Sequence, residues 1–372
     1  MGTDEKPSGV SLSQETKTGC AGGGVICIVV GLNIFLLLFF AVTQNTFGQT
    51  SNNRLDLCKA SGFIMGQRLS LNHIKTEYPS LSLQVKKVEL EFQAAFGTAE
   101  KNIEKSLRDL LNDEYNEYNV TVKEQMQSNL QSQRISKEIA LQYLDAVESR
   151  AKGQIASPIL ETLLHYQFEE KPAEEFIRGY KKTYRTKEHP KAKGLDLQID
   201  YPISWSLREG KRPNIIQFFS SGNGNGPAYT EILIRNITKE AQGELTNEEI
   251  RALASLEGCK ELASELFSES SLRDMVEGMG FANLRIITSK RVVLDNWPGA
   301  MIECIGDKQR LDFTFTMYNK MYYALYKNYL IFLSFQVSKL PDDTTDLLKA
   351  RFSKFDPLFQ LMANSLVIQS QY

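Results

Sequence analysis

Histidine is scarce in this chain of 372 residues, and the residue patterns that most metal and catalytic sites require are missing. The three histidines, His73, His165 and His189, lie in different segments, without H-x-x-x-H or H-E-x-x-H spacing. The five cysteines are an odd number without C-x-x-C spacing, so they indicate neither a zinc site nor a disulfide framework. No phosphate-binding loop and no G-x-S-x-G motif is present either. The sequence therefore predicts no metal, no cofactor and no enzymatic activity.

The chain also lacks a large excess of charge of either sign. The chain carries 43 Lys and Arg against 45 Asp and Glu, and 42% of its residues are hydrophobic. This balance excludes a disordered chain and one that coats nucleic acid. At roughly 100–200 residues per domain, the length predicts two or three folded units.

One apolar segment departs from this average. Residues 25–43 carry no charge, and within Val25 to Val42 only Gly31 and Asn33 are not hydrophobic. A bilayer core of about 30 Å requires about 20 apolar helical residues. We therefore expect residues 25–43 to form a single-pass transmembrane anchor behind a flexible tail, residues 1–24.

A cleaved signal peptide is the alternative reading of the same segment, with residues 25–43 as its apolar core. Cleavage near Gly48 would then release a secreted, soluble protein. A signal peptide usually begins with a short, positively charged leader. Here the leader contains Asp4, Glu5 and Glu15, which favours the uncleaved anchor. The charges on the two flanks do not decide the membrane orientation.

Helical periodicity dominates residues 50–166. An apolar residue recurs every three or four positions from Val85 to Leu110 and again from Ile135 to Ala151. Pro79 ends a short expected helix that begins near Leu71, and residues 119–133 are expected to be a polar connector. The pattern predicts a helical hairpin or small bundle. It could serve as a stalk, as a homo-oligomerisation surface, or simply as a packed subdomain.

Residues 167–193 are rich in basic side chains and are expected to be a linker. Such a cluster near a membrane is also a candidate contact with an anionic surface, worth about 1 kcal/mol per residue. The candidate contact residues are Lys181, Lys182, Arg185, Lys187, Lys191 and Lys193.

From residue 194 the period changes from 3.6 to 2, which predicts strands. Asp196 and Asp200 share one face of the first strand, where solvent exposure explains them better than catalysis. The glycine-rich connector 222–227 predicts a hairpin turn rather than a phosphate site. Further strands are expected at 215–219, 229–237, 284–294, 301–305, 311–318 and 322–337, with helices near 246–256, 259–267, after Ser271, and at 343–364, the last interrupted near Pro357. Together they predict an α+β domain over residues 194–372.

The order of these features resembles a known fold. Three segments carry this resemblance. They are the run from Leu195 to Tyr201-Pro-Ile-Ser-Trp205, then Trp297-Pro-Gly299 before three strands, and a last helix ending in Ala363-Asn-Ser365. This arrangement is similar to the PsbP-like fold, which extrinsic photosystem II subunits and DcrB-type bacterial envelope proteins share. The resemblance covers roughly residues 180–372. The whole chain also resembles bacterial proteins with a helical part before such a domain.

The resemblance implies a binding or assembly module rather than an enzyme, with an antiparallel sheet and flanking helices. We accordingly expect a membrane-anchored, non-catalytic protein of a bacterial cell envelope. Its C-terminal domain would be periplasmic or extracellular and would bind a protein partner of unknown identity, but no nucleic acid. One alternative is a small-ligand carrier or enzyme that uses a groove of the sheet. The other is the secreted protein released near Gly48.

Overall fold

The computed structural model describes residues 50–240, 246–310, 313–340 and 342–372. The expected tail and the expected membrane anchor at residues 25–43 lie outside these ranges. Among the residues that are described, no helix is long and apolar enough to span a bilayer.

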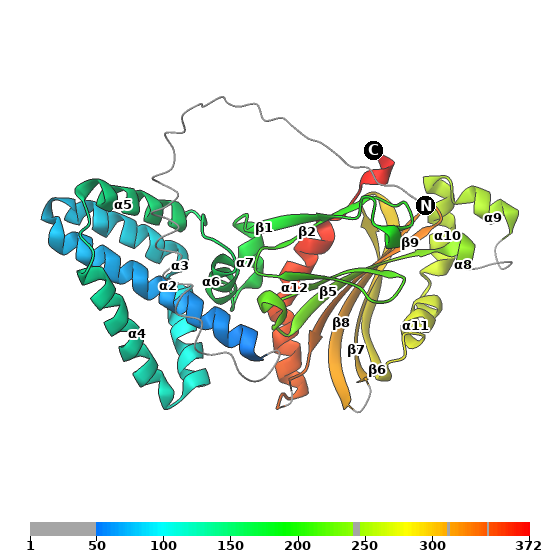
Figure 1. Cartoon of the computed structure of the whole chain (residues 1–372). Coiled ribbons are helices and arrows are strands. Elements are labelled where there is room, and N and C mark those ends of the chain that lie inside the picture. Colours follow the sequence, from blue (N-terminus) through cyan, green and yellow to red (C-terminus); the bar gives the residue numbers. More distant parts are fainter. Residues whose placement is uncertain (1–49, 241–245, 311–312, 341) are drawn as a thin grey trace, which may run out of the picture. The chain divides into compact units, whose positions relative to one another are not determined.

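The first described part is a small bundle of helices (Figure 1). Its helices are α2 (Thr50–Glu77), α3 (Ser82–Leu111), α4 (Glu114–Gln131), α5 (Lys137–Ala151) and α6 (Ile159–Gln167), with a 3₁₀ turn, η2 (Pro79–Leu81), between α2 and α3. They enclose their own hydrophobic core, in which Phe96, Ile103, Leu107, Leu163 and Leu164 are almost completely buried. The expected bundle is therefore present.

The apolar stripe that predicts α3 is the stripe that the helix buries. Each predicted position from Val85 to Leu107 lies in the core, whereas Leu110 is exposed and its neighbour Leu111 is buried instead. The helix ends at Leu111, and its C-cap residue, Asn112, has a positive φ of 46°. Local periodicity thus predicted this helix almost to its last turn.

Two helices are longer than the sequence indicated. The short helix expected from Leu71 is the end of the 28-residue α2, and the expected polar connector 119–133 lies largely within α4. In α4 only Tyr115 and Val122 are buried. Because so few of its side chains enter the core, the segment lacks the apolar periodicity by which a helix is recognised.

The second part contains a seven-stranded antiparallel sheet in the order β3-β4-β5-β9-β8-β7-β6 and a three-stranded sheet, β1-β2-β10. The strands are β1 (Lys181–Arg185), β2 (Leu197–Pro202), β3 (Ser206–Glu209), β4 (Ile215–Ser220), β5 (Ala228–Asn236), β6 (Ala282–Leu294), β7 (Trp297–Arg310), β8 (Phe313–Tyr326), β9 (Tyr329–Ser338) and β10 (Val367–Ile368). The helices are α7 (Pro172–Ile177), α8 (Ile237–Glu240), α9 (Asn247–Ala252), α10 (Leu256–Leu266), α11 (Glu269–Glu277) and α12 (Thr345–Asn364), with 3₁₀ turns η3 (Pro190–Ala192), η4 (Gly222–Gly224) and η5 (Gln369–Gln371). The mixed helix and antiparallel-sheet class is as predicted.

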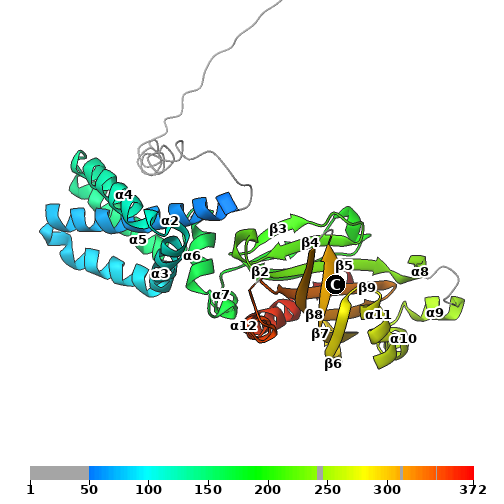
Figure 2. The ribbon, with the colours of Figure 1, turned by 90° about the horizontal axis from the view of Figure 1, so that it is seen from below.

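Helices cover both faces of the larger sheet. Phe359 of α12 packs against Phe335 of β9, with ring centroids 5.1 Å apart. On the other face, Phe267 packs against Tyr323 of β8 at 6.3 Å. Figure 2 shows α12 and the α10–α11 pair on opposite sides of the long strands. The sheet is therefore the middle layer of this part of the chain.

Three expected boundaries differ from the structure. The strand expected to end at Tyr318 continues to Tyr326, and the turn lies at Lys327, whose φ is 50°. Helix α12 continues through Pro357 without the expected interruption. The expected linker 167–193 contains α7, β1 and η3, and β1 pairs with β2. Residues before 194 are thus part of the folded domain rather than a linker.

Candidate functional site

A cleft of about 350 Å³ lies among α6, α7, the loop around η4 and α12. Aromatic and apolar side chains form much of its wall, including Phe168, Trp205 and Phe355. Its polar wall includes His165, Glu175, Ser221, Asn225, Arg351 and Lys354. These elements are far apart in the sequence, so only the fold brings the residues together.

The carboxyl group of Glu175 is buried in this cleft, with only 2% of the residue exposed. Its Oε1 accepts a hydrogen bond from the Ser204 amide at 2.8 Å, and its Oε2 accepts one from Ser204 Oγ at 2.7 Å. Burial raises the pKa of Glu175 to about 7, although the bonds from Ser204 act in the opposite direction. This carboxyl group therefore changes its charge near neutral pH.

His165 lies on α6 at the same cleft. Its ring packs edge-on against Tyr166, and it is so close to Gly222 that a Cβ atom there would lie 3.1 Å from Cε1. Burial, together with the positive charge of Lys354, lowers the pKa of His165 to about 4. The imidazole is therefore neutral at physiological pH and can donate one hydrogen bond and accept another.

Helix α12 supplies two cations, which differ in how firmly they are held. Arg351 donates two hydrogen bonds to the carboxylate of Asp343, and this contact lowers the pKa of Asp343 to about 2. Lys354 Nζ lies 3.3 Å from Oε1 of Glu170, whose side chain is 80% exposed. Exposed pairs of this kind contribute only about 0–1 kcal/mol. Lys354 is therefore the cation that the cleft can offer to an incoming anion.

The glycine-rich loop at the cleft does not form an anion-binding nest. The amide of Asn223 donates to Ser204 O, that of Asn225 donates to Gly222 O, and those of Gly224 and Gly226 both donate to Ser221 O, at 2.8–3.0 Å. Because these amides have backbone partners, they are not presented to a phosphate. The turn expected from the sequence is present, but the sequence did not indicate that it lines a cleft.

The six basic residues singled out in the sequence do not line this cleft. Four of them lie beside carboxylates: Lys181 beside Asp200, Lys182 beside Glu161, Arg185 beside Asp196, and Lys191 beside Glu209. Lys193 donates to Asn214 Oδ1 at 3.2 Å, and Lys187 is exposed. Nearby acids thus compensate most of the positive charge that the sequence places in a row.

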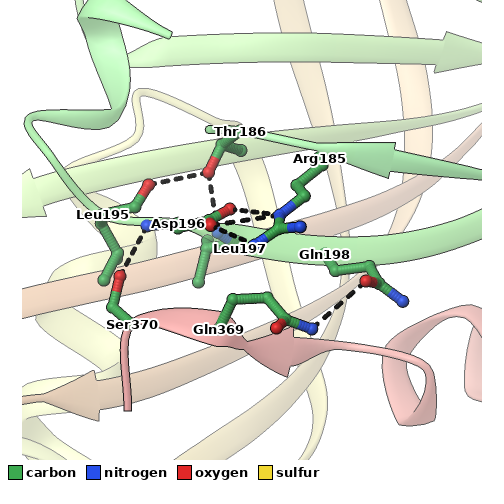
Figure 3. Close-up of polar contacts among 8 residues, drawn as sticks. All are labelled: Arg185, Thr186, Leu195, Asp196, Leu197, Gln198, Gln369 and Ser370. Atoms are coloured by element: carbon green, nitrogen blue, oxygen red, sulfur yellow. Dashed lines mark hydrogen bonds and ion pairs between the residues drawn. The ribbon is translucent and has the colours of Figure 1, made fainter. Parts of the chain in front are cut away.

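Figure 3 shows one of these pairs, in which the guanidinium group of Arg185 contacts both carboxylate oxygens of Asp196. Arg185 Nε lies 2.9 Å from Oδ1 of Asp196, and its Nη2 lies 2.6 Å from Oδ2. The amide of Asp196 donates to Ser370 Oγ at 2.8 Å, and Gln369 Nε2 donates to Gln198 Oε1 at 3.2 Å. Asp196 therefore holds β1 and the C-terminal segment against β2, a structural role.

Sequence reasoning missed Glu175 and Lys354. Glu175 follows Glu174 in a short helix, and nothing in the sequence distinguishes the buried carboxyl from its half-buried neighbour. Among the described residues, no group of three or more His, Cys, Asp or Glu could hold a metal ion.

No protein-family model matches the chain, and the search of curated proteins finds no match. Solved structures that are similar include cyanobacterial PsbP from Synechocystis sp. PCC 6803, at 14% identity over 51% of this chain and 92% of that one, with a TM-score of 0.30. The Ran-binding protein Mog1p of Saccharomyces cerevisiae is 8% identical over 50% of this chain and 95% of its own, with a TM-score of 0.32. LpqN of Mycobacterium tuberculosis, involved in cell envelope biogenesis, is 9% identical over 53% and 96%, with a TM-score of 0.27.

The expected resemblance to PsbP is thus confirmed, and it extends to about half of this chain. At such identities the likeness concerns the fold and says nothing of what this chain binds.

Proposed function

We propose that this protein is a membrane-anchored, non-catalytic binding protein whose cleft holds a small organic anion. The observation that carries the proposal is Lys354, a weakly paired cation at a cleft whose wall also contains the aromatic side chains of Phe168, Trp205 and Phe355. An anion that enters the cleft can replace the exposed carboxylate of Glu170 as the partner of Lys354. A monocarboxylate with an aromatic or aliphatic body fits this combination of charge and apolar wall.

The neighbouring groups favour a mono-anion over a more highly charged ligand. Arg351 is already engaged by Asp343, and His165 is neutral at physiological pH. Glu175 adds negative charge to the cleft as pH rises through its pKa of about 7. Binding should therefore be stronger at pH 6 than at pH 8, because the Glu175 carboxylate repels a ligand anion.

The cleft is a better candidate for a ligand-binding site than a groove on the sheet. The two faces of β8 are covered from opposite sides, since Tyr322 and Tyr323 are 8% and 3% exposed. The sheet-groove carrier and the sheet-groove enzyme thus have less structural support than the cleft.

Benzoate is a suitable probe for the cleft. We expect millimolar benzoate to raise the melting temperature of the full chain in nonionic detergent, because a ligand that binds only the folded state stabilises it. Lys354→Gln should abolish this shift. The matched control is Lys349→Gln on the same helix, since Lys349 is also paired with a carboxylate but does not line the cleft. An equal shift in all three proteins, or none in any, would contradict the proposal.

The proposed anchor rests on the uncharged sequence of residues 25–43. Leu37→Arg should move the protein from the carbonate-resistant membrane fraction to the soluble fraction, because an arginine at the centre of a span costs about 2.5–3.5 kcal/mol. The mass of the mature N-terminus separates this proposal from secretion. A chain that begins directly after Gly48 would show that the segment is a cleaved signal.

A further inference from the structure

Strand β6 forms one edge of the seven-stranded sheet and pairs only with β7 within the part of the chain that the structure describes. It is 13 residues long. The outward-facing N–H and C=O groups of an edge strand are available to pair with another extended chain. The edge thus offers a template for an added strand.

Two register shifts interrupt the pairing of β6 with β7 and so shorten the regular part of this edge. The register shifts between Ala282 and Arg285 and again between Ile286 and Thr288. From Thr288 to Leu294 the pairing with β7 is continuous. An added strand would therefore find a regularly paired segment of about seven residues, close to the usual length of a strand, with Lys290 inside it and Arg285 just before it.

The side chains of β6 indicate which kind of strand would fit. The strand contains three cations, Arg285, Lys290 and Arg291, and no acidic residue. Among the described residues, Arg285 and Lys290 have no ion-pair partner, whereas Arg291 donates to the carbonyl oxygen of Ser264 at 2.8 Å. Two apolar side chains on this strand are also exposed, Ile287 at 44% and Val293 at 70%.

We propose that the outer edge of β6 binds an extended, acidic segment of a partner protein by strand addition. Main-chain hydrogen bonds would supply affinity, and the unpaired cations would select carboxylates. A second copy of this chain fits poorly, because pairing two β6 strands would bring six cations together. No residue of β6 lines the cleft, so the surface is independent of the proposed small-ligand site.

A fluorescent peptide that alternates glutamate with threonine tests the proposal by anisotropy with the full chain in nonionic detergent. We expect the acidic peptide to bind, and a peptide that alternates lysine with threonine to bind at least about tenfold more weakly, equivalent to about 1.4 kcal/mol. Arg285→Glu with Lys290→Glu should reverse this preference. The matched control, Lys101→Glu with Lys105→Glu on the exposed side of α3, should leave it unchanged.

A third peptide separates strand addition from simple charge attraction. N-methylation of alternate amides in the acidic peptide removes main-chain donors but keeps every carboxylate, so we expect binding to be lost. Equal binding of the methylated peptide, equal binding of the lysine peptide, or no binding of the acidic peptide would each overturn the proposal. So would a stable dimer in sedimentation experiments that Val293→Glu dissociates, because the occupant would then be a second copy.

Discussion

Lys320 on β8 and Asp356 on α12 form an ion pair between the sheet and the helix, with Nζ 2.6 Å from Oδ1. The same Nζ lies 3.0 Å from Oε1 of Glu303 on β7, and the lysine side chain is only 5% exposed. Burial opposes the charge of Lys320, but hydrogen bonds to the two carboxylates outweigh it and raise its pKa. One buried cation thus connects two strands and a helix.

Removal of this cation should destabilise the sheet domain strongly. Lys320→Met leaves Asp356 and Glu303 without their shared partner, and breaking a buried pair costs about 3–5 kcal/mol. Urea unfolding followed by tryptophan fluorescence measures the loss, because both tryptophans of the chain lie in this domain. Lys349→Met, which breaks an exposed pair on α12, should cost less than about 1 kcal/mol. Similar losses of unfolding free energy in the two variants would refute this stabilising role of Lys320.

Glu175 should make stability fall as pH rises from 4.5 to 7. Its pKa is about 7 in the folded protein against 4.5 ordinarily, so the folded state binds the proton more tightly. The stabilisation is complete below pH 4.5 and is lost as pH rises through about 7, amounting to about 3 kcal/mol at most. Glu175→Gln should remove this part of the pH dependence.

The pH experiment needs a second variant, because desolvation also raises the pKa of the half-buried Glu231 to about 7. Glu231→Gln should leave the Glu175 contribution in place. We would abandon the assignment if the free energy of unfolding of wild-type protein and Glu175→Gln changed in parallel between pH 4.5 and 8.

Substitution of two glycines by alanine should change the stability of the protein in opposite directions. At Gly299 in β7 a Cβ atom would lie 2.2 Å from the carbonyl oxygen of Tyr323 on the neighbouring strand, so the strands must separate. We expect a loss of about 1–3 kcal/mol. At Gly62 in α2 the nearest atom is Met126 Cε at 3.6 Å, and alanine should stabilise the helix by about 0.5–1 kcal/mol. Scanning calorimetry measures both, and changes of the same sign would be unexpected.

The basic residues near β1 remain a proposed contact with anionic lipid. If Lys181 and Arg185 face the bilayer, then Asp200 and Asp196 oppose the attraction. Asp196→Asn with Asp200→Asn should therefore increase co-sedimentation of residues 50–372 with phosphatidylserine vesicles by about tenfold or more, at about 1 kcal/mol per charge. Asp342→Asn with Asp346→Asn provides the control, and an unchanged affinity in the first variant would argue against the contact.

Elements were predictable where their burial follows a local period. The apolar stripe of α3 is buried as expected, and the helix expected near 246–256 begins as α9, which a capping box of Thr246 and Glu249 opens. The turn at Lys327 was not predicted, because the expected strands 311–318 and 322–337 left their gap at residues 319–321, where Asn319 and Lys320 are in fact buried within β8. The charge of the buried Lys320 is compensated by Glu303 on β7 and Asp356 on α12, which the local sequence does not contain.

The sequence by itself determined the uncharged segment 25–43, the helical and strand periods, and the absence of the common metal-binding and catalytic motifs. Only the tertiary structure decided that Glu175, His165 and Lys354 share one cleft and that β6 lies at an edge. The physical reason is that the pKa of a side chain depends on its desolvation and on nearby charges. In the same way, the position of a strand at the edge of a sheet depends on which strands pair with one another. Both depend on contacts between residues that are far apart along the chain.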